Sequence, residues 1–491
     1  MHWKVISISF TMASIKRNFA YNVLLNVSRV IFPLITAPYI SRVLEPDGIG
    51  LFNFANTYAG YFALFAVLGI PTYGIREVAK KHDDKDGLSK LVSELISISF
   101  IATCIVTLVY VASIFFIEQL DENRVIFLVS GFLLYFAPFR IDWFYSGLEQ
   151  FKYITLRTLV IRVASIVCMF IFVRTKSDLL IYVILNACGT ICGDVWNYVK
   201  LLQSGVRPRL TFAGLKKHLS PLFILFASSI AISVYTVLDT LMLGFITDYQ
   251  QVGYYNSAVH ISKTILSVVT SLSAVAIPKM SQYSQAHEYG KVNDLANKSF
   301  SVVSFLAIPS AIGLCCLAPT FVPLFFGSKF VGSVVPLMIL SFLIVAIGLN
   351  NLSGVQILIG MGHDKLFLYS VLCGTVFNFV LNLALIPFMG AIGASMASVF
   401  AEFLILGVTL WFVYRRTPVR IMQYGEIFKS LAGSILFIPL AIVLNLFLKG
   451  WVFVFVFIVC GVGLFLLLQR ILKNKSLDLI LPVVLHKLHL Q

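Results

Sequence analysis

Apolar stretches long enough to cross a membrane follow one another along almost the whole chain, from residue 20 to residue 470. The hydrocarbon core of a bilayer is about 30 Å thick, and a helix of about 20 apolar residues crosses it. Within that core, only helices and closed barrels satisfy the hydrogen bonds of their own backbone. These stretches are too long and too uniformly apolar for barrel strands. The pattern therefore predicts an all-α membrane protein whose functional groups lie inside a helix bundle.

Fourteen such stretches can be placed, so the sequence predicts about fourteen transmembrane helices. The predicted spans are residues 20–41, 50–73, 92–117, 125–146, 154–173, 179–200, 219–246, 252–277, 299–326, 334–360, 366–387, 391–414, 428–448 and 451–469. None of the segments between them is long enough to hold a soluble domain.

The composition agrees with this class of protein. Of the 491 residues, 59% are hydrophobic and only 12% are charged, and the mean hydropathy is +0.92. Soluble domains carry about 25% charged residues. The net charge of +15 does not indicate nucleic-acid binding, because the basic residues lie in short loops between the spans.

These basic residues also predict the orientation of the chain. If alternate loops lie on opposite sides of the membrane, one side has 27 Lys and Arg residues and the other has six. Cytoplasmic loops are enriched in Lys and Arg, so we expect both termini to be cytoplasmic. Residues 1–19 are predicted to be a cytoplasmic or interfacial lead rather than a cleaved signal, with Met12 as a second candidate start. Residues 470–491 are predicted to be a cytoplasmic tail.

The chain contains an internal repeat. Gly50–Asn53 aligns with Gly253–Asn256, and Gly147–Lys152 aligns with Gly360–Lys365. Spans 1–6 therefore correspond to spans 7–12, in the same orientation, because six is an even number. We expect two six-helix lobes related by a pseudo-two-fold axis along the membrane normal, with a central site between them. The predicted parts are an N-lobe at 20–202, a cytoplasmic linker at 203–218, a C-lobe at 219–414 and two extra C-terminal helices at 428–469.

Three segments resemble a known family of transporters. Pro38–Gly50 is similar to the first external loop of bacterial polysaccharide flippases of the Wzx type, Gly69–Glu77 to their second-span exit, and Asp142–Lys152 to their fourth-span exit. Their superfamily also includes multidrug exporters and peptidoglycan-lipid flippases. The resemblance implies a V-shaped cavity between two lobes, alternating access, and a polyprenyl-pyrophosphate-linked oligosaccharide as substrate, for capsule or O-antigen assembly. It also implies the bacterial cytoplasmic membrane as location, membrane lipid and the polysaccharide polymerase machinery as partners, and a monomer.

Several ionisable residues lie inside predicted spans, where they are costly and usually face the bundle interior. Arg29, Arg140, Arg162 and Lys263 are candidate substrate-binding residues, because cations suit a pyrophosphate or an acidic sugar and Arg binds such groups bidentately. The alternative is that each pairs with a carboxylate of the protein. The remaining intramembrane charges, to which the sequence assigns no role, are Asp142, Asp194 and Glu402.

A second set of residues suggests a monovalent cation site. Asp239 lies on the seventh span, Asn378 and Asn382 lie one turn apart on the eleventh, and Ala394 and Ser398 repeat that spacing on the twelfth. Carboxylate, amide, hydroxyl and carbonyl oxygens suit a hard cation, and the resemblance implies such a site on these three helices. Na⁺ or H⁺ is the expected coupling ion, with no other metal or cofactor. The alternative is that these side chains are polar links between helices.

The sequence disfavours an enzyme. A multispan glycan polymerase would need acidic or metal-binding residues on a sizeable external loop, and the external loops here are short. The most acidic of them, Glu118–Glu122, lacks metal-ligand spacing. Because no Walker A motif occurs, transport energy must come from an ion or substrate gradient. A peptidoglycan-lipid flippase and a cation-coupled multidrug exporter stay open as alternatives, although spans 13 and 14 exceed the twelve usual for the exporters.

The predicted topology can be tested by single cysteine replacements in a cysteine-free background. Because of the charge asymmetry, Lys176→Cys and Lys329→Cys should react with a membrane-impermeant thiol reagent added to intact cells. His287→Cys and Arg416→Cys should react only after the cells are opened. An exchanged result at either pair would refute the number of spans between them.

Overall fold

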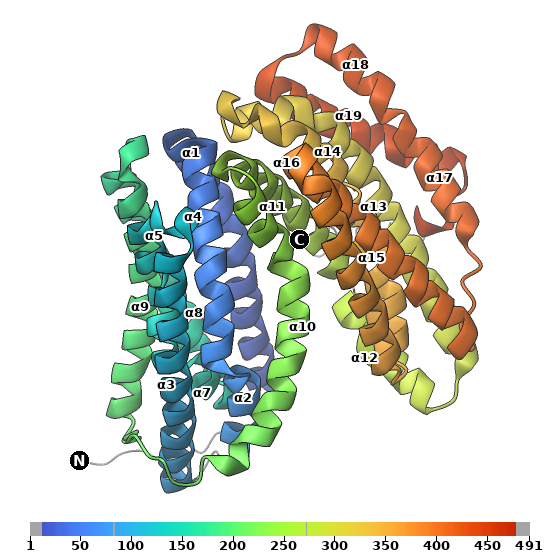
Figure 1. Cartoon of the computed structure of the whole chain (residues 1–491). Coiled ribbons are helices and arrows are strands. Elements are labelled where there is room, and N and C mark those ends of the chain that lie inside the picture. Colours follow the sequence, from blue (N-terminus) through green and yellow to red (C-terminus); the bar gives the residue numbers. More distant parts are fainter. Residues whose placement is uncertain (1–11, 82–83, 272, 478–491) are drawn as a thin grey trace. The chain divides into compact units, whose positions relative to one another are not determined.

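The computed structural model describes residues 12–81, 84–271 and 273–477, and this part of the chain consists of helices and the segments that connect them, without a β-strand (Figure 1). The lead and the tail predicted from the sequence lie largely outside the described residues. The first half contains α1 (Met12–Val67), α2 (Ile70–Lys80), α3 (Lys85–Phe116), α4 (Glu118–Asp121), α5 (Arg124–Ser130), α6 (Phe132–Tyr135), η1 (Ala137–Phe139), α7 (Asp142–Gly147), α8 (Phe151–Phe172), η2 (Lys176–Asp178), α9 (Leu179–Gln203) and α10 (Lys216–Ile246). The second half contains α11 (Tyr249–Ser271), α12 (Ser273–Gln285), α13 (Tyr289–Phe325), η3 (Ser328–Ser333), α14 (Val334–Leu340), α15 (Leu343–Asn350), the π-helix η4 (Asn351–Ile359), α16 (Asp364–Arg416), α17 (Tyr424–Ile435), α18 (Phe437–Phe447) and α19 (Gly450–Ile471).

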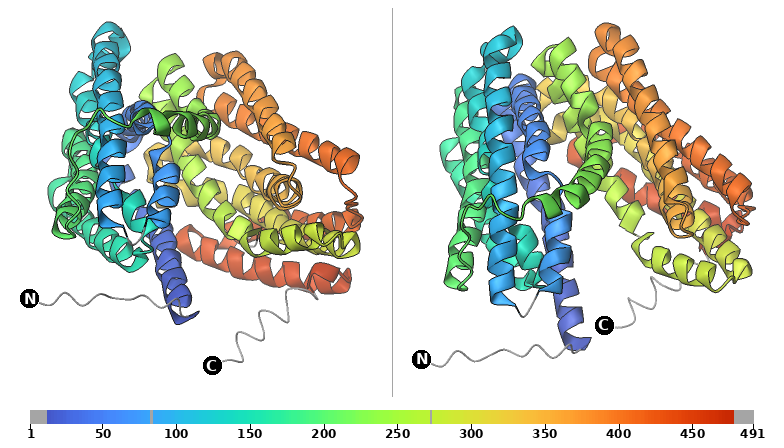
Figure 2. Two further views of the ribbon diagram at one scale, coloured as in Figure 1. Left: turned by 90° about the horizontal axis from the view of Figure 1, so that it is seen from below. Right: turned by 60° about the horizontal axis from the view of Figure 1, so that its bottom comes forward.

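The chain divides into two compact units. Unit 1 consists of Met1–Leu44 and Phe54–Val234, and unit 2 consists of Glu45–Asn53 and Tyr235–Gln491. The long helices of unit 1, coloured from blue to green, run side by side in Figure 1 and in the right-hand view of Figure 2. The division falls inside α10, whereas the sequence predicts a linker at 203–218. The lobe boundaries therefore stay a prediction.

Within the described residues, nine helices are long and apolar enough to cross a membrane, or ten if the bent pair Tyr249–Ser271 and Ala276–Gln285 is one span. Two of them, α1 and α16, each cover two predicted spans. The backbone leaves the helical conformation at Glu45 in α1 and at Gly390 in α16, between the two spans that each helix covers. The predicted class of protein is confirmed, and the count of fourteen spans stays a prediction.

The fourth predicted span, 125–146, is not one continuous helix. It is divided among α5, α6, η1 and α7. Gly131 follows α5, and Pro138 lies in the first turn of η1, where it has no N–H to donate. This break places Arg140 outside a regular helix, between η1 and α7.

Two of the family-like segments pack against each other in unit 1. Gly74 of α2 lies under the ring of Trp143 in α7, so that a Cβ at Gly74 would be 2.4 Å from the indole. A Cβ on Gly147, at the end of α7, would lie 2.8 Å from the side chain of Val78 in α2. Trp143 and Val78 belong to one buried apolar cluster of unit 1. Small residues allow such close approach between helices, which explains why both segments contain glycine.

The segment between α9 and α10 is fastened to α3. The backbone N–H of Arg209 donates to the hydroxyl of Ser93, at 3.0 Å, and a similar bond follows two residues later. The carboxylate of Glu94, which is 1% exposed, is 2.8 Å from both Lys217 and His218 at the start of α10. The first part of α10 is thus held within unit 1.

In unit 2, two glycines that the sequence repeat aligns meet directly. A Cβ on Gly50 would lie 1.6 Å from the carbonyl oxygen of Tyr249 and 2.8 Å from the nitrogen of Gly253. A Cβ on Gly253 would lie 2.1 Å from the carbonyl oxygen of Pro46. The side chain of Glu45 forms an ion pair with Lys329 next to this contact. The last part of this family-like segment, residues 45–50, is therefore a packing element of unit 2.

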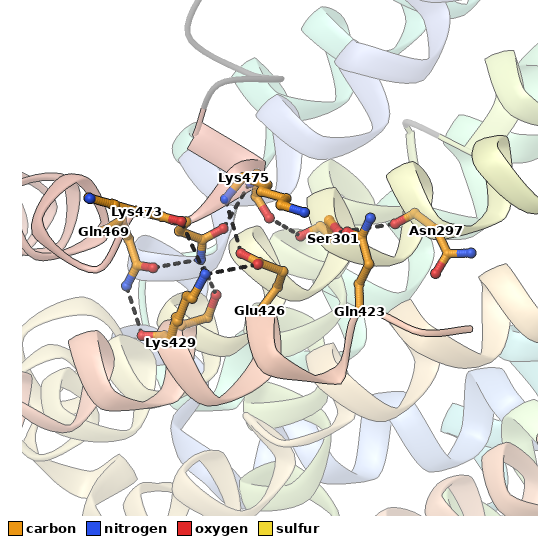
Figure 3. A network of polar contacts seen from close by, with 11 residues as sticks. Asn297, Ser301, Gln423, Glu426, Lys429, Gln469, Lys473 and Lys475 are labelled. Atoms are coloured by element: carbon orange, nitrogen blue, oxygen red, sulfur yellow. Dashed lines mark hydrogen bonds and ion pairs between the residues drawn. The ribbon is translucent and has the colours of Figure 1, made fainter. Parts of the chain in front are cut away.

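The C-terminal helices of unit 2 are joined by a polar network, shown in Figure 3. Glu426 of α17 accepts hydrogen bonds from Lys429 at 3.0 Å and from the backbone of Lys475 at 3.1 Å. Lys429 also donates to the carbonyl oxygen of Lys473, and Gln469 of α19 donates to the carbonyl oxygen of Lys429. Both α17 and α19 pack on α13. The buried carboxylate of Glu426 is paired with Lys429 and accepts a backbone hydrogen bond, so its role is structural.

The close contact at Gly50 predicts a sharp difference between two glycines of the same helix. Gly50→Ala should lower the thermal stability of the purified protein, because the new methyl group overlaps backbone atoms and overpacking costs about 1–3 kcal/mol. Gly60→Ala is the matched control, since a Cβ there would meet nothing within 4 Å. Equal melting temperatures for the two variants in detergent would refute the contact.

Candidate functional site

Unit 1 encloses a cavity of about 550 Å³. Its walls come from the first half of α1, from α8, from α9 and from the irregular segment around Arg140. Three of the four predicted substrate-binding residues, Arg29, Arg140 and Arg162, line this one cavity. Asp142 and Asp194 line it as well. Residues that are far apart in the sequence thus form a single charged site.

One ion pair of this cavity was not foreseen from the sequence. Arg157 of α8 is 7% exposed and donates to Asp142 at 2.9 Å and to the carbonyl oxygen of Gly193 at 3.3 Å. Asn197 of α9 also donates to Asp142, at 2.7 Å. The sequence signal for this pair was that Arg157 lies within the predicted span 154–173, where a charged residue needs a partner. These contacts join α7, α8 and α9 and satisfy both charges.

A second ion pair is looser. The Nε of Arg140 is 3.8 Å from Asp194, and the same guanidinium donates to the carbonyl oxygen of Leu133 at 3.1 Å. Asp194 is 4% exposed, and one of its buried carboxylate oxygens has no hydrogen bond among the described residues. Asp194 is therefore compensated in charge but incompletely hydrogen-bonded.

The other two guanidinium groups of the cavity have no carboxylate partner among the described residues. Arg29 donates to the amide oxygen of Asn26 at 3.3 Å. Arg162 donates to the hydroxyl of Ser28 at 3.0 Å and lies over the ring of Phe32, with 5.8 Å from its guanidinium carbon to the ring centroid. With two pairs neutralised, Arg29 and Arg162 leave an excess of positive charge that suits an anion.

The fourth predicted substrate-binding residue, Lys263, lies on α11 in unit 2. It is within electrostatic range of Asp239 and forms no ion pair shorter than 4 Å with a described residue. Its predicted role in binding the substrate stays a prediction.

The predicted cation-site residues of unit 2 meet around Asp239. The carboxylate of Asp239, on α10, accepts hydrogen bonds from Asn382 and Ser398 of α16, at 2.5 Å and 2.7 Å. The hydroxyl of Tyr255 on α11, which the sequence analysis did not identify, donates to the same carboxylate at 2.5 Å. Asn382 also donates to the amide oxygen of Asn378, at 3.1 Å. Five oxygen-bearing groups from three helices thus form one cluster around the partly buried carboxylate of Asp239.

The composition of this cluster fits a hard cation. The carbonyl oxygen of Ala394 accepts a hydrogen bond from Ser398 at 2.9 Å, so it lies at the cluster as predicted. The amide oxygen of Asn382 is buried without a partner among the described residues. Carboxylate, amide, hydroxyl and carbonyl oxygens are the ligands that hard cations prefer. The network of hydrogen bonds equally fits polar links between helices, and the role of the cluster stays a prediction.

Unit 2 also contains an apolar groove of about 520 Å³. Its walls come from α13, α18 and α19, with Ile265 of α11. Gly313 and Gly461 lie on either side of Phe437 within it. No charged side chain is among the residues that line this groove.

Comparison with known protein sequences places this arrangement in a family. The family model described as polysaccharide biosynthesis protein matches residues 15–284, which is more than half of the chain. A protein of Escherichia coli (strain K12) named as an O-antigen transporter is 26% identical over 408 residues, covering 82% of this chain and 97% of that protein. A Haloferax volcanii protein named for low-salt glycan biosynthesis, the flippase Agl15, is 24% identical over 227 residues, which is 45% of this chain and 46% of that protein.

Comparison with solved structures gives the same fold. A lipid II flippase MurJ in an inward closed conformation aligns with a TM-score of 0.62 at 17% identity, covering 91% of this chain and 99% of that chain. An inward-facing multidrug resistance transporter of the MATE family aligns with a TM-score of 0.61 at 15% identity, covering 79% of this chain and 94% of that chain. At these identities the likeness shows the fold alone.

Proposed function

Because the chain belongs to the polysaccharide biosynthesis protein family, and is a membrane transporter of the flippase type rather than an enzyme, we propose that its substrate is a polyprenyl-pyrophosphate-linked oligosaccharide repeat unit. The proposed flippase moves this unit across the bacterial cytoplasmic membrane by alternating access, for assembly of a capsule or O-antigen. In this proposal the protein acts as a monomer with both termini in the cytoplasm, alongside the polysaccharide polymerase machinery.

The observation that carries the proposal is the pair of uncompensated guanidinium groups in the cavity of unit 1. Arg29 and Arg162 line the same cavity, and each is hydrogen-bonded only to neutral groups among the described residues. A pyrophosphate carries several negative oxygens, and guanidinium groups bind such oxygens through paired, charge-assisted hydrogen bonds. Like charges in one cavity repel each other, and an anion between them removes that repulsion. The cavity is therefore electrostatically matched to the head group of the lipid carrier.

The two ion pairs of the cavity have different parts in this proposal. Arg157 and Asp142 form a close pair with further hydrogen bonds, which holds α7, α8 and α9 together. Arg140 lies at 3.8 Å from Asp194, a distance at which no hydrogen bond joins them. An incoming anion can recruit Arg140 at a smaller cost, because less hydrogen bonding is lost. The proposal therefore assigns anion binding to Arg29 and Arg162, with Arg140 as a third group.

The apolar groove of unit 2 supports a lipid-linked substrate. Its lining is almost wholly hydrocarbon, including Phe305, Phe437 and Phe465. A polyprenyl chain is a branched hydrocarbon. Lipid tails are equally apolar, so this chain binds the groove favourably only if it packs there better than the membrane lipid does. The groove is therefore a candidate contact surface for an isoprenoid chain.

For ion coupling, we propose that the Asp239 cluster of unit 2 binds Na⁺ or H⁺. Asp239 is the acceptor for three hydrogen-bond donors, and an unpartnered oxygen of Asn382 lies beside it. Binding of an ion would change the charge of this cluster by one unit within the membrane. Such a change can drive transport only if the two access states differ in their affinity for the ion.

A second candidate substrate is a peptidoglycan lipid, because the chain shares its fold with a flippase of such a lipid. The lipid II flippase shares the fold over 91% of this chain. A lipid-linked peptidoglycan precursor also has a pyrophosphate between lipid and sugar, so the cavity of unit 1 alone does not discriminate. The two candidates differ in which cellular defect the chain repairs.

The substrate site predicts a specific loss of function at Arg29. Arg29→Ala should reach the membrane at normal levels, because Ala is the best helix former, yet fail to restore surface glycan in a strain that lacks its O-antigen or capsule flippase. Arg29→Lys should restore it in part, because Lys keeps the charge and loses the two-pronged hydrogen bonding. The measurement is the amount of surface glycan per amount of membrane-inserted protein.

Arg174→Ala is the control for this experiment, since Arg174 lies outside the cavity and is exposed. Normal export by well-expressed Arg29→Ala would exclude an essential role for this residue. Loss of the protein from the membrane would instead favour a structural role. If the wild-type chain repairs only a strain depleted of its lipid II flippase, the peptidoglycan lipid replaces the oligosaccharide as substrate.

The ion site predicts a second phenotype. An ion that binds only the folded protein stabilises it. Purified wild-type protein should therefore melt at a higher temperature when Na⁺ replaces choline, if Na⁺ is the ion, or when the pH is lowered at constant salt, if the ion is H⁺. Asp239→Ala should fold and lose this response, whereas Asp294→Ala, at an exposed carboxylate paired with Lys298, should keep it. A wild-type protein without any ion response, or an Asp239→Ala variant with the full response, would favour polar links between helices.

A further inference from the structure

A stripe of buried polar residues runs along one face of α16 in unit 2. Ser395, Ser398, Glu402 and Thr409 are all at most 8% exposed. Their spacings of three, four and seven residues keep them on one face of a helix. Glu402 is the one member of this stripe with an ionisable side chain. The stripe passes from the Asp239 cluster along α16 toward the C-terminal end of that helix.

The members of the stripe on either side of Glu402, Ser398 and Thr409, are joined to other helices by hydrogen bonds. Ser398 donates to Asp239 and lies 3.0 Å from the hydroxyl of Tyr255. Thr409 lies 2.8 Å from the hydroxyl of Ser353 and donates to the amide oxygen of Asn350 at 3.2 Å. The helix rises about 1.5 Å per residue, so Glu402 is about 6 Å along the axis from Ser398. Glu402 thus lies between two groups of hydroxyl-bearing side chains.

Glu402 itself makes no hydrogen bond and no ion pair with any residue that the structure describes. It is 5% exposed, and one of its carboxyl oxygens is completely buried without a partner. The contrast with other buried carboxylates is clear, because Glu94 contacts Lys217 and His218, and Glu426 contacts Lys429. A partner-free carboxyl does not link helices, so a structural role does not account for it.

No cation compensates this carboxyl from the neighbouring elements. Among the described elements, α11, α14, α15 and η4 pack against α16, and α10 reaches it through Asp239. Helices α14, α15 and η4 contain no ionisable residue. On the part of α11 beyond its first turn, the ionisable residues are Tyr254, Tyr255, His260 and Lys263, and α10 contributes Asp239. His260 and Lys263 are the only ones of these residues with a side-chain nitrogen, and neither forms an ion pair with Glu402 within 4 Å. The ionised form of a buried carboxyl without a partner is strongly disfavoured, whereas its neutral form is tolerated.

We propose that Glu402 is a proton-exchange site of unit 2, separate from the Asp239 cluster. In one state the carboxyl is neutral and buried. In another, water reaches the stripe and the carboxyl releases one proton, breaking its O–H bond and forming one on water. Hydroxyl groups both donate and accept hydrogen bonds, so Ser398 and Thr409 can support this exchange on either side. The inference rests on the proposed function, because it supplies that transporter with a proton as coupling ion.

The first experiment uses wild-type protein and needs no variant that could misfold. Dicyclohexylcarbodiimide attaches to neutral carboxyl groups in apolar surroundings. The peptide that contains Glu402 should be labelled when the reaction is run at mildly acidic pH. The labelled fraction should fall in reactions run at progressively higher pH. The peptide that contains Glu426 is the internal control and should stay unmodified, because its carboxylate is paired with Lys429 at 3.0 Å. Mass spectrometry that finds no adduct on Glu402 at any pH, or an adduct that does not depend on pH, would overturn the proposal.

The second experiment counts protons. Purified wild-type protein, titrated from acidic to alkaline pH in lipid nanodiscs, should release one proton more per molecule than Glu402→Gln. Identical titrations would overturn the proposal, because they would mean that Glu402 never changes its protonation in this range. Export in the flippase-deficient strain supplies the functional readout, where Glu402→Gln should flatten the dependence of glycan export on external pH. An unchanged pH profile in a fully exporting Glu402→Gln variant would also overturn it.

These readouts separate this inference from the proposed function. If the wild-type chain fails to restore glycan export, the proposed substrate is wrong, while the carbodiimide adduct and the proton count still decide the assignment of Glu402. If the wild-type chain restores export and both chemical readouts at Glu402 are negative, only the proton-exchange site is wrong.

Discussion

A charge inside the bilayer must be compensated by the protein, because the surrounding hydrocarbon offers neither water nor counter-ions. Most of the described intramembrane charges meet this requirement. Arg157 is paired with Asp142, Arg140 lies near Asp194, and Asp239 accepts three hydrogen bonds. The groups that do not meet it are therefore informative. An arginine or a glutamic acid that is kept in the bundle without a partner has a cost in stability, and a function that uses the uncompensated group accounts for that cost.

The same absence of water changes how helices are held together. Apolar side chains are stabilised little by leaving lipid, so close packing and interhelical hydrogen bonds provide most of the stabilisation of helix association. Glycine contacts of this kind occur at Gly74, Gly147 and Gly50, and all three lie in the segments that resemble the polysaccharide flippases. Those segments therefore preserve the fold, while the charges of the cavity lie mostly elsewhere, on α1, α8 and α9. Similarity in the segments alone identifies the family but says little about the substrate.

Periodicity along one helix was sufficient to predict part of the site. The four-residue spacing puts Asn378 and Asn382 on one helix face, and it does the same for Ala394 and Ser398. In the structure, one member of each pair donates a hydrogen bond to Asp239 and the other accepts one from that member. Contacts between helices were not predictable in this way. Tyr255 and Arg157 reach their carboxylates because of how neighbouring helices are rotated, which depends on packing along the whole bundle. For the same reason the hydropathy pattern did not show that 125–146 is broken into short helices.

The two units carry complementary chemistry. The cavity of unit 1 has two guanidinium groups without a carboxylate partner, and unit 2 has carboxyl groups at Asp239 and Glu402. An anion is thus expected to bind unit 1 and a cation unit 2. Coupling between two such events is a free energy shared by both sites, and it is reciprocal. It exists only if each ligand prefers one conformation of the transporter over the other. If the cation moves inward while the anion moves outward, both movements carry charge in the same sense, so a membrane potential that is negative inside favours the exchange.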